Sequence, residues 1–340
     1  MRSLGGLWCL VGGKWLVYAS EALCRTRDEW SWGMTFKENA RLDTSQVRSG
    51  GGGRSGGGGG GMAVGGGIGG IILLVLFMLF GGNLGGTSGV ADPETSWNFS
   101  GAEVDGTGEE GASGDFSHCK TGADANQYRD CLVVGTVNSV QQFWSSAWSQ
   151  YQPAKTVIFS GVVNTGCGTA NSQVGPFYCP LDQQVYIDVS FFDQLDQMGG
   201  DGGSLSQMYV VGHEYGHHVQ NLNGVLGRAQ QDPQGPESGA VRVELQADCY
   251  AGVWVAHADG TRLGQEDAAI LEPVTQEQIQ SALTAAEAVG DDRIQQSMQG
   301  RVTPENWTHG SSAQRQHWFM TGYQTGDPNQ CNTFAATDLG

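Results

Sequence analysis

Two histidines of this chain, His213 and His217, are four positions apart in a window whose pattern predicts a helix. Residues four apart lie on the same face of a helix, so both imidazoles can reach one metal ion. Glu214 lies between them and can act as a base on water bound at the open side of that ion. This His-Glu-x-x-His arrangement is typical of zinc hydrolases.

A catalytic zinc ion usually has three protein ligands and a water molecule, so a third ligand should come from another helix. Glu244 and Asp248 are four residues apart in a second window that is predicted to be helical. Glu244 can bind the metal, and Asp248 can accept a hydrogen bond from the outer nitrogen of a ligand histidine. The sequence therefore predicts one zinc ion held by the two histidines and Glu244, with Asp248 in support.

Two helices must face each other to bring these residues together. Apolar periodicity predicts the first helix over 204–221, with Ser204 as its N-cap and a glycine-rich break before it. The second helix is predicted over 241–258. The stretch between them is rich in Gly, Pro and Asn, which permits the chain to reverse its direction.

The other elements predict an α+β domain that is mostly helical and has a small antiparallel sheet. They are a helix over 123–151, strands over 156–159 and 184–188, a disulfide-closed loop or hairpin over 161–180, a helix over 264–289 that is interrupted at Pro273, and a helix over 311–323.

The chain has 340 residues and a net charge of −18, and this charge is unevenly distributed. Residues 1–61 carry eight basic and five acidic residues, whereas the rest of the chain carries nine basic and 30 acidic ones. An acidic surface does not suit nucleic-acid binding, which requires lysine and arginine against phosphate. It is typical of a solvated, exported domain.

No charged residue lies between Arg54 and Asp92, and 68–80 is almost purely apolar. As a helix, residues 62–82 would span about 30 Å, which is the thickness of one bilayer core. We expect a single transmembrane anchor, and the alternative is a cleaved signal peptide. Arginines before this segment and acids after it predict a cytoplasmic N-terminus and an extracytoplasmic domain.

The chain divides into five parts on these grounds. Residues 1–33 fit neither a linker nor an anchor, and we expect the natural protein to begin at Met34. The remaining parts are a Gly/Ser-rich cytoplasmic tail (34–61), the anchor (62–82), a flexible tether (83–115) and the folded domain (116–340).

Six of the eight cysteines follow the predicted anchor. An even number on the oxidising side of a membrane favours three disulfides. A metal site made of cysteines is disfavoured because no two of them stand in a Cys-x-x-Cys spacing. Proximity along the chain favours the pairs Cys119–Cys131 and Cys167–Cys179, which leaves Cys249–Cys331.

The two motifs together resemble the gluzincin metallopeptidases, in which His-Glu-x-x-His is followed by Glu-x-x-x-Asp on a second helix. The longer strings at 213–220, 244–252, 309–312 and 326–334 are similar to the bacterial putative neutral zinc metallopeptidase family. This resemblance covers residues 34–334. It implies a gluzincin-like active-site helix, one zinc ion and a peptide or protein substrate.

The resemblance also implies roles for individual residues. Glu214 would take a proton from the zinc-bound water that attacks the peptide carbonyl, and would pass it to the leaving amine. A further donor should stabilise the oxyanion, and His309 is the first candidate, followed by Tyr323 and Arg315. His309 could instead cap the helix that follows it. An edge strand binds substrate in gluzincin-like folds, so Tyr186–Asp188 either line the cleft or form an ordinary strand.

Three functions remain open from the sequence. The first is a zinc endopeptidase anchored in the cytoplasmic membrane and working outside it. The second is a regulatory or binding protein that keeps the fold and cleaves poorly, and the third is a zinc amidase that acts on cell-wall peptides. The intact Glu214 favours an enzyme, because a protein that only binds has no need of the base. The sequence carries no signal for an oligomeric state.

Overall fold

The computed structural model describes residues 7–11, 14–18, 35–50, 116–261 and 269–340. The predicted start at Met34, the anchor 62–82 and the tether 83–115 lie outside the described residues. None of the helices in the described ranges is long and apolar enough to cross a membrane. The chain forms two units, 1–34 and 35–340. Within the first unit, β1 (Leu7–Val11) pairs with β2 (Lys14–Tyr18) in an antiparallel hairpin.

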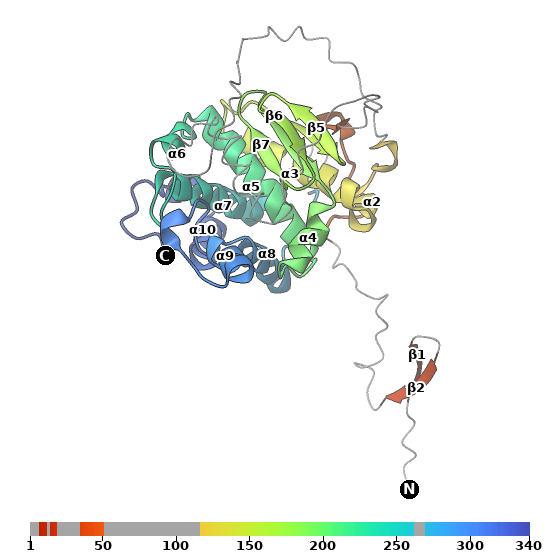
Figure 1. The fold of residues 1–340 in the computed structure, drawn as a ribbon. Coiled ribbons are helices and arrows are strands. Elements are labelled where there is room, and N and C mark those ends of the chain that lie inside the picture. Colours follow the sequence, from red (N-terminus) through yellow and green to blue (C-terminus); the bar gives the residue numbers. More distant parts are fainter. Residues whose placement is uncertain (1–6, 12–13, 19–34, 51–115, 262–268) are drawn as a thin grey trace, which may run out of the picture. The chain divides into compact units, whose positions relative to one another are not determined.

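The second unit is mostly helical and contains small sheets, which confirms the predicted α+β class (Figure 1). Its strands are β3 (Val47–Gly50), β4 (Lys155–Phe159), β5 (Val162–Thr165), β6 (Gly168–Asn171), β7 (Phe177–Cys179) and β8 (Gln184–Asp188). Its α-helices are α2 (Gly122–Gln127), α3 (Arg129–Ala147), α4 (Phe191–Gln197), α5 (Ser204–Leu222), α6 (Gly227–Gln231), α7 (Gly239–His257), α8 (Gln276–Ala288), α9 (Asp291–Gln299) and α10 (Ser312–Thr325).

The main sheet has the strand order β3-β4-β8-β7 and is mixed, so the prediction of an antiparallel sheet is wrong. β4 runs parallel to both β3 and β8, and only β7 and β8 are antiparallel. The physical reason is the length of the connections. A tight turn joins β7 to β8, whereas long crossovers, which parallel pairing requires, join the other neighbours. β8 lies between β4 and β7, but β7 pairs only with Gln184–Tyr186, so Ile187 and Asp188 extend beyond it.

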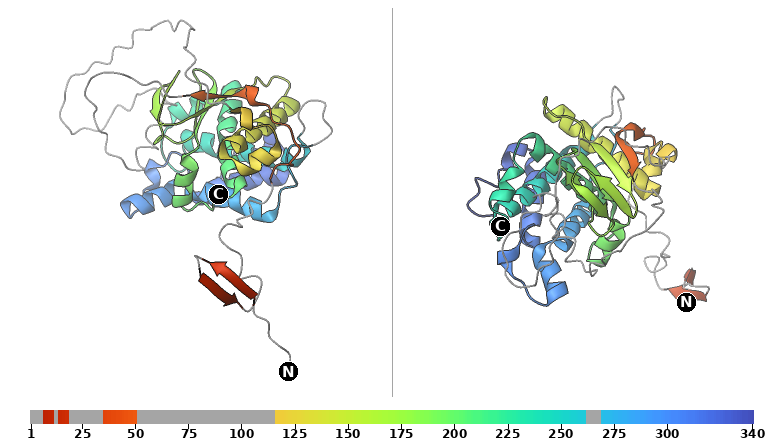
Figure 2. Two further views of the ribbon diagram at one scale, coloured as in Figure 1. Left: turned by 90° about the vertical axis from the view of Figure 1, so that its right-hand side faces the viewer. Right: turned by 45° about the horizontal axis from the view of Figure 1, so that its top comes forward.

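Residues 35–50 belong to the folded unit. The prediction of a tail over 34–61, separate from a domain that begins at 116, is therefore wrong for these residues. β3 pairs with β4 from Val47 to Gly50 and lies beside the green strands in Figure 2. Phe36 is fully buried, and its ring packs so closely on α3 that a Cβ added to Gly135 would lie 2.5 Å from it. A few apolar side chains within a polar stretch are enough to dock this segment.

Two asparagines fix the backbone of the same segment. Asn126 accepts a hydrogen bond from Phe36 N at 2.9 Å and donates one to Phe36 O at 2.7 Å. Asn138 makes the same pair of contacts with the backbone of Asp43, each at 2.8 Å. One membrane crossing at 62–82 would place this segment and the domain on opposite sides. The packing is therefore incompatible with a cytoplasmic segment 35–50 combined with an extracytoplasmic domain.

We expect Phe36→Ala to lower the free energy of unfolding by about 3–5 kcal/mol, because it empties a fully buried aromatic site. Denaturant unfolding of the purified protein measures this loss. Leu42→Ala, at a partly buried position of the same segment, serves as the control and should cost less. Equal stability of Phe36→Ala and the wild type would show that residues 35–50 do not dock in solution.

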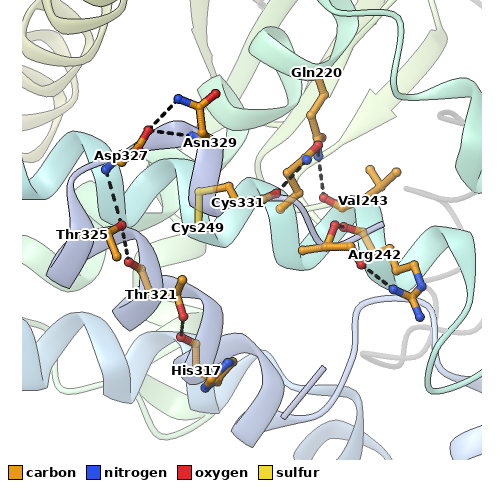
Figure 3. The surroundings of a disulfide bond; sticks show 12 residues. Gln220, Arg242, Val243, Cys249, His317, Thr321, Thr325, Asp327, Asn329 and Cys331 are labelled. Carbon is orange, nitrogen blue, oxygen red and sulfur yellow. Dashed lines mark hydrogen bonds between the residues drawn. A yellow bond between two sulfur atoms is a disulfide. The ribbon is translucent and has the colours of Figure 1, made fainter. Parts of the chain in front are cut away.

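Three disulfides brace the domain, and they are the pairs that proximity along the chain favoured. Cys119–Cys131 holds the entry to α3, and Cys167–Cys179 ties the β5–β6 turn to β7. Cys249–Cys331 joins α7 to the segment after α10 (Figure 3). Cys331 O also accepts a hydrogen bond from Gln246 Nε2 at 2.8 Å, so this segment is fixed along α7. These contacts hold the helix that carries Glu244.

Candidate metal centre

The site is built on two helices that pack at very short distance. α5 carries His213, Glu214 and His217, and α7 carries Glu244. Gly216 allows the close approach, because a Cβ at this position would lie only 2.9 Å from Ala247 Cα on α7. The close contact places Glu244 opposite the two histidines.

The three expected ligands form one buried cluster. Glu244 Oε2 lies 3.2 Å from His213 Nε2, and Glu244 Oε1 lies 3.5 Å from His217 Nε2. One possible ligand atom from each of the three residues lies within 4.8 Å of the other two. Zinc bonds of about 2.0–2.1 Å in a tetrahedral site separate two ligand atoms by about 3.4 Å. The residues therefore fit a zinc ion and leave a fourth position for water.

Each histidine is oriented by a partner on its outer nitrogen. His213 Nδ1 lies 2.8 Å from Asp248 Oδ1, and His217 Nδ1 lies 2.9 Å from Gln220 Oε1. Since both partners accept hydrogen bonds, each neutral ring carries its proton on Nδ1 and turns the lone pair of Nε2 to the cluster. The structure thus places Asp248 where the sequence predicted it, beside a ligand histidine.

Sequence reasoning did not assign the role of Gln220. Its amide nitrogen donates to Val243 O at 2.7 Å and to Gln246 Oε1 at 3.1 Å, so the side chain is locked against α7 (Figure 3). The available signal was its position three residues after His217, on the same helical face. An amide at that spacing can support a histidine as a carboxylate does.

Asp248 is itself held in a buried ion pair. Arg315 Nε and Nη2 donate to its two oxygens at 2.9 Å each, and Tyr209 OH donates to Oδ1 at 2.5 Å. Burial would raise the pKa of Asp248, but Arg315 and His213 hold it below its usual value. Asp248 therefore remains an anion that can orient His213. The contacts of Arg315 are directed at Asp248, which does not favour it as the oxyanion donor.

The electrostatics of the cluster suit a cation. Burial would raise the pKa of Glu244, but His217, His309 and His213 hold it well below its usual range, so it is a carboxylate. Burial would lower the pKa of His213, but Asp248 and Glu244 raise it to about 10. A protonated His213 carries a second ring proton, on Nε2, which faces Glu244. A metal ion that binds Nε2 must displace this second proton, so metal binding releases a proton. For Glu214, burial raises the pKa.

A cavity of about 110 Å³ opens beside the cluster, and it is lined by Glu214 and His309 together with the expected ligands. The structure thus brings His309 to the site, whereas Tyr323 does not line this cavity. Asp291, at the start of α9, fixes the loop that carries His309. Its Oδ2 accepts hydrogen bonds from the backbone N–H groups of Thr308, His309 and Gly310 at 2.7, 2.7 and 3.1 Å.

We expect Asp291→Asn to lower the free energy of unfolding at pH 7 by about 1–3 kcal/mol. The substitution replaces the buried carboxylate that accepts three backbone hydrogen bonds with a neutral amide. Burial would raise the pKa of Asp291, but His309 and the backbone N–H groups lower it. The stabilisation is thus fully present above the unfolded pKa of about 4 and is lost as the pH falls through the lower folded value. Urea unfolding from pH 7 to pH 2 should show the two proteins converging in acid. A constant difference would contradict this role.

A second group of possible ligands lies around Cys119 and Cys131, with His118 and Asp130. Both cysteines are joined in a disulfide, so their sulfurs do not serve as thiolate ligands. Within the part of the chain that the structure describes, the cluster on α5 and α7 is therefore the better metal site.

Comparisons with known proteins agree with this site. Residues 34–334 match a family model described as "Putative neutral zinc metallopeptidase", which confirms the resemblance inferred from the motifs. The uncharacterized protein Rv2575 of Mycobacterium tuberculosis (strain ATCC 25618 / H37Rv) is 57% identical over 227 residues, which cover 66% of this chain and 78% of the relative. The uncharacterized protein YpfJ of Escherichia coli (strain K12) is 43% identical over 217 residues, which cover 62% and 72%. No solved structure matches the chain.

Proposed function

This chain belongs to the putative neutral zinc metallopeptidase family, and we propose that it is an active peptidase that hydrolyses peptide bonds with a zinc-activated water. The observation that carries the proposal is the position of Glu214. It lies between the two histidines on α5, is buried, and lines the same cavity as the cluster. A protein that used zinc only for structure would have no need of a carboxylate beside the open position.

His213, His217 and Glu244 would hold the zinc ion, which when bound supplies a Lewis acid and brings the pKa of its water toward about 7. Glu214 accepts the proton of the attacking water and returns it to the leaving amine. Its buried position raises its pKa, which suits a group that must both take and give a proton near neutral pH.

We assign the stabilisation of the oxyanion to His309. Its Nδ1 is 2.9 Å from Thr308 Oγ1 and 3.4 Å from Asp291 Oδ1, which leaves Nε2 as the nitrogen available to a substrate. Burial would lower the pKa of His309, but Glu244 and Asp291 raise it, so the ring favours the donor form. A donor fixed in a buried cavity stabilises developing negative charge more than it would in water.

The three disulfides suggest that the domain works outside the cytoplasm. The apolar segment 62–82 supports attachment to the cytoplasmic membrane. Because residues 35–50 and the later domain form one unit, both belong on the same side of a membrane.

Purified protein with intact disulfides is the material for testing the function. We expect it to cleave members of an unbiased peptide mixture, to lose this activity to a zinc chelator, and to regain it with one equivalent of zinc. Mass spectrometry of the products is the readout. Cleavage of cell-wall peptides alone would favour the amidase, and bound zinc with no cleavage of either would favour a binding protein.

A further inference from the structure

The cavity beside the cluster continues away from the expected metal position as an apolar pocket. Its walls come from α4, α5 and α9 and from the segments around 177 and 289. Its apolar lining includes the side chains of Phe177, Phe191, Met198, Val210, Val289 and Ile294.

The pocket begins directly at the reacting groups. Val210 precedes His213 by three residues and Glu214 by four, so the three share one face of α5. A substrate whose carbonyl lies at the metal and Glu214 therefore places a neighbouring side chain against Val210. The pocket is thus in the position to select a residue adjacent to the bond that is cut.

Apart from the expected ligands, Glu214 and His309, the polar side chains that line the pocket are Tyr178, Tyr209 and Arg315, and these already have partners within the protein. Tyr209 OH donates to Asp248, and Tyr178 OH lies 3.0 Å from His218 Nδ1 and accepts from Asn221 Nδ2 at 2.9 Å. Arg315 lies against Asp248, Tyr209 and Val289 O. These three side chains therefore offer no new partner to a charged group of a substrate, and burying such a group unpaired would be costly.

The apolar lining also continues to the surface. A second hollow between α4 and α9 shares Met198 and Ile294 with the pocket and is also lined by the exposed Met298, beside the polar residues Gln197, Arg293 and Ser297. The cation nearby, Arg293, forms an ion pair with Glu287. Methionine side chains adapt their shape to different ligands, so the pocket can take long as well as branched apolar groups.

We propose that this enzyme cuts peptide bonds next to a large apolar residue such as leucine, methionine or phenylalanine, whose side chain enters between α4, α5 and α9. The inference rests on the proposed peptidase function and names its substrate class. The determinants are Val210, Met198 and Ile294.

Binding of small hydroxamates tests the pocket without requiring turnover. The hydroxamate group chelates zinc, and the probes differ only in carrying a leucine, alanine, glutamate or lysine side chain. Calorimetry with the zinc-loaded protein should show the leucine probe binding about 10- to 100-fold more tightly than the alanine probe, and the charged probes no better than alanine. Equal affinities for the leucine and glutamate probes would overturn the proposal.

A matched pair of variants tests whether the preference for the leucine probe arises in this pocket. Ile294 is half-buried at the pocket wall, and Ile294→Lys should weaken the leucine probe and strengthen the glutamate probe. Gln296→Lys adds the same charge at an exposed position of α9 and should change neither. If Ile294→Lys does not fold, the comparison of probes on the wild type still decides the question.

The two proposals fail in different ways. Selective binding of the leucine probe by a protein that cleaves no peptide would leave the pocket assignment standing and overturn the peptidase function. Cleavage without preference for apolar neighbours would do the reverse. Failure of all four probes to bind zinc-loaded protein would overturn both.

Discussion

Glu214→Gln is expected to abolish peptide hydrolysis while the zinc content and the fold remain unchanged. The amide has the shape of the carboxylate but cannot take a proton from water, and a general base contributes about 10²- to 10⁴-fold to such a reaction. Because Glu214 is not one of the three proposed ligands, loss of its charge should leave the metal bound. Steady-state cleavage of a peptide and metal analysis of the same preparation measure the two effects.

Glu237→Gln is the matched control for this experiment, since it makes the same chemical change at an exposed glutamate just before α7. It should retain full activity. Equal rates for Glu214→Gln and the wild type would show that the hydrolysis does not use this base, and the mechanism would have to be abandoned.

The second large effect is expected from Glu244→Ala, which should lose both the zinc ion and the activity. Glu244 supplies the oxygens that lie 3.2 and 3.5 Å from the two histidine nitrogens, so its removal takes away one of the three proposed ligands. We expect zinc affinity to fall by more than the roughly 10- to 100-fold that loss of a supporting group such as Gln220 causes. Competition against a chromogenic chelator measures this affinity.

Glu237→Ala and Gln220→Ala complete the comparison. The first should bind zinc as the wild type does, and the second should show an intermediate loss, because His217 would keep its place but lose its orienting partner. If Glu244→Ala held a full equivalent of zinc at wild-type affinity, the third ligand would have to be another residue.

The site helices could be predicted from the sequence because their signals are local. The apolar period and the break before Ser204 predicted a helix over 204–221, and α5 spans Ser204–Leu222. The prediction of 241–258 lies within two residues of α7 at each end. Spacing within a helix follows from its geometry, so the faces of His213, His217 and Glu244 could be inferred without knowing how the helices pack.

The parts that could not be predicted depend on contacts between distant segments. Asp291 lies at the start of a short polar helix, and its role exists only because the loop at 308–310 returns to it. The docking of 35–50 depends on Phe36 and two asparagines of α2 and α3, whereas its composition is that of a linker. β3 and β4 run parallel because a long connection joins them. The sequence of neither strand carries a signal for this direction.

The order of the segments along the chain has a consequence for biosynthesis. β3 is made about 100 residues before its partner β4. The last part of the chain supplies Asp291 and His309 to the pocket, and it supplies Arg315 to the ion pair with Asp248. A nascent or prematurely ended chain therefore holds the ligand helices without a complete catalytic site. The proposed peptidase activity therefore requires the last part of the chain and should not appear before that part is made.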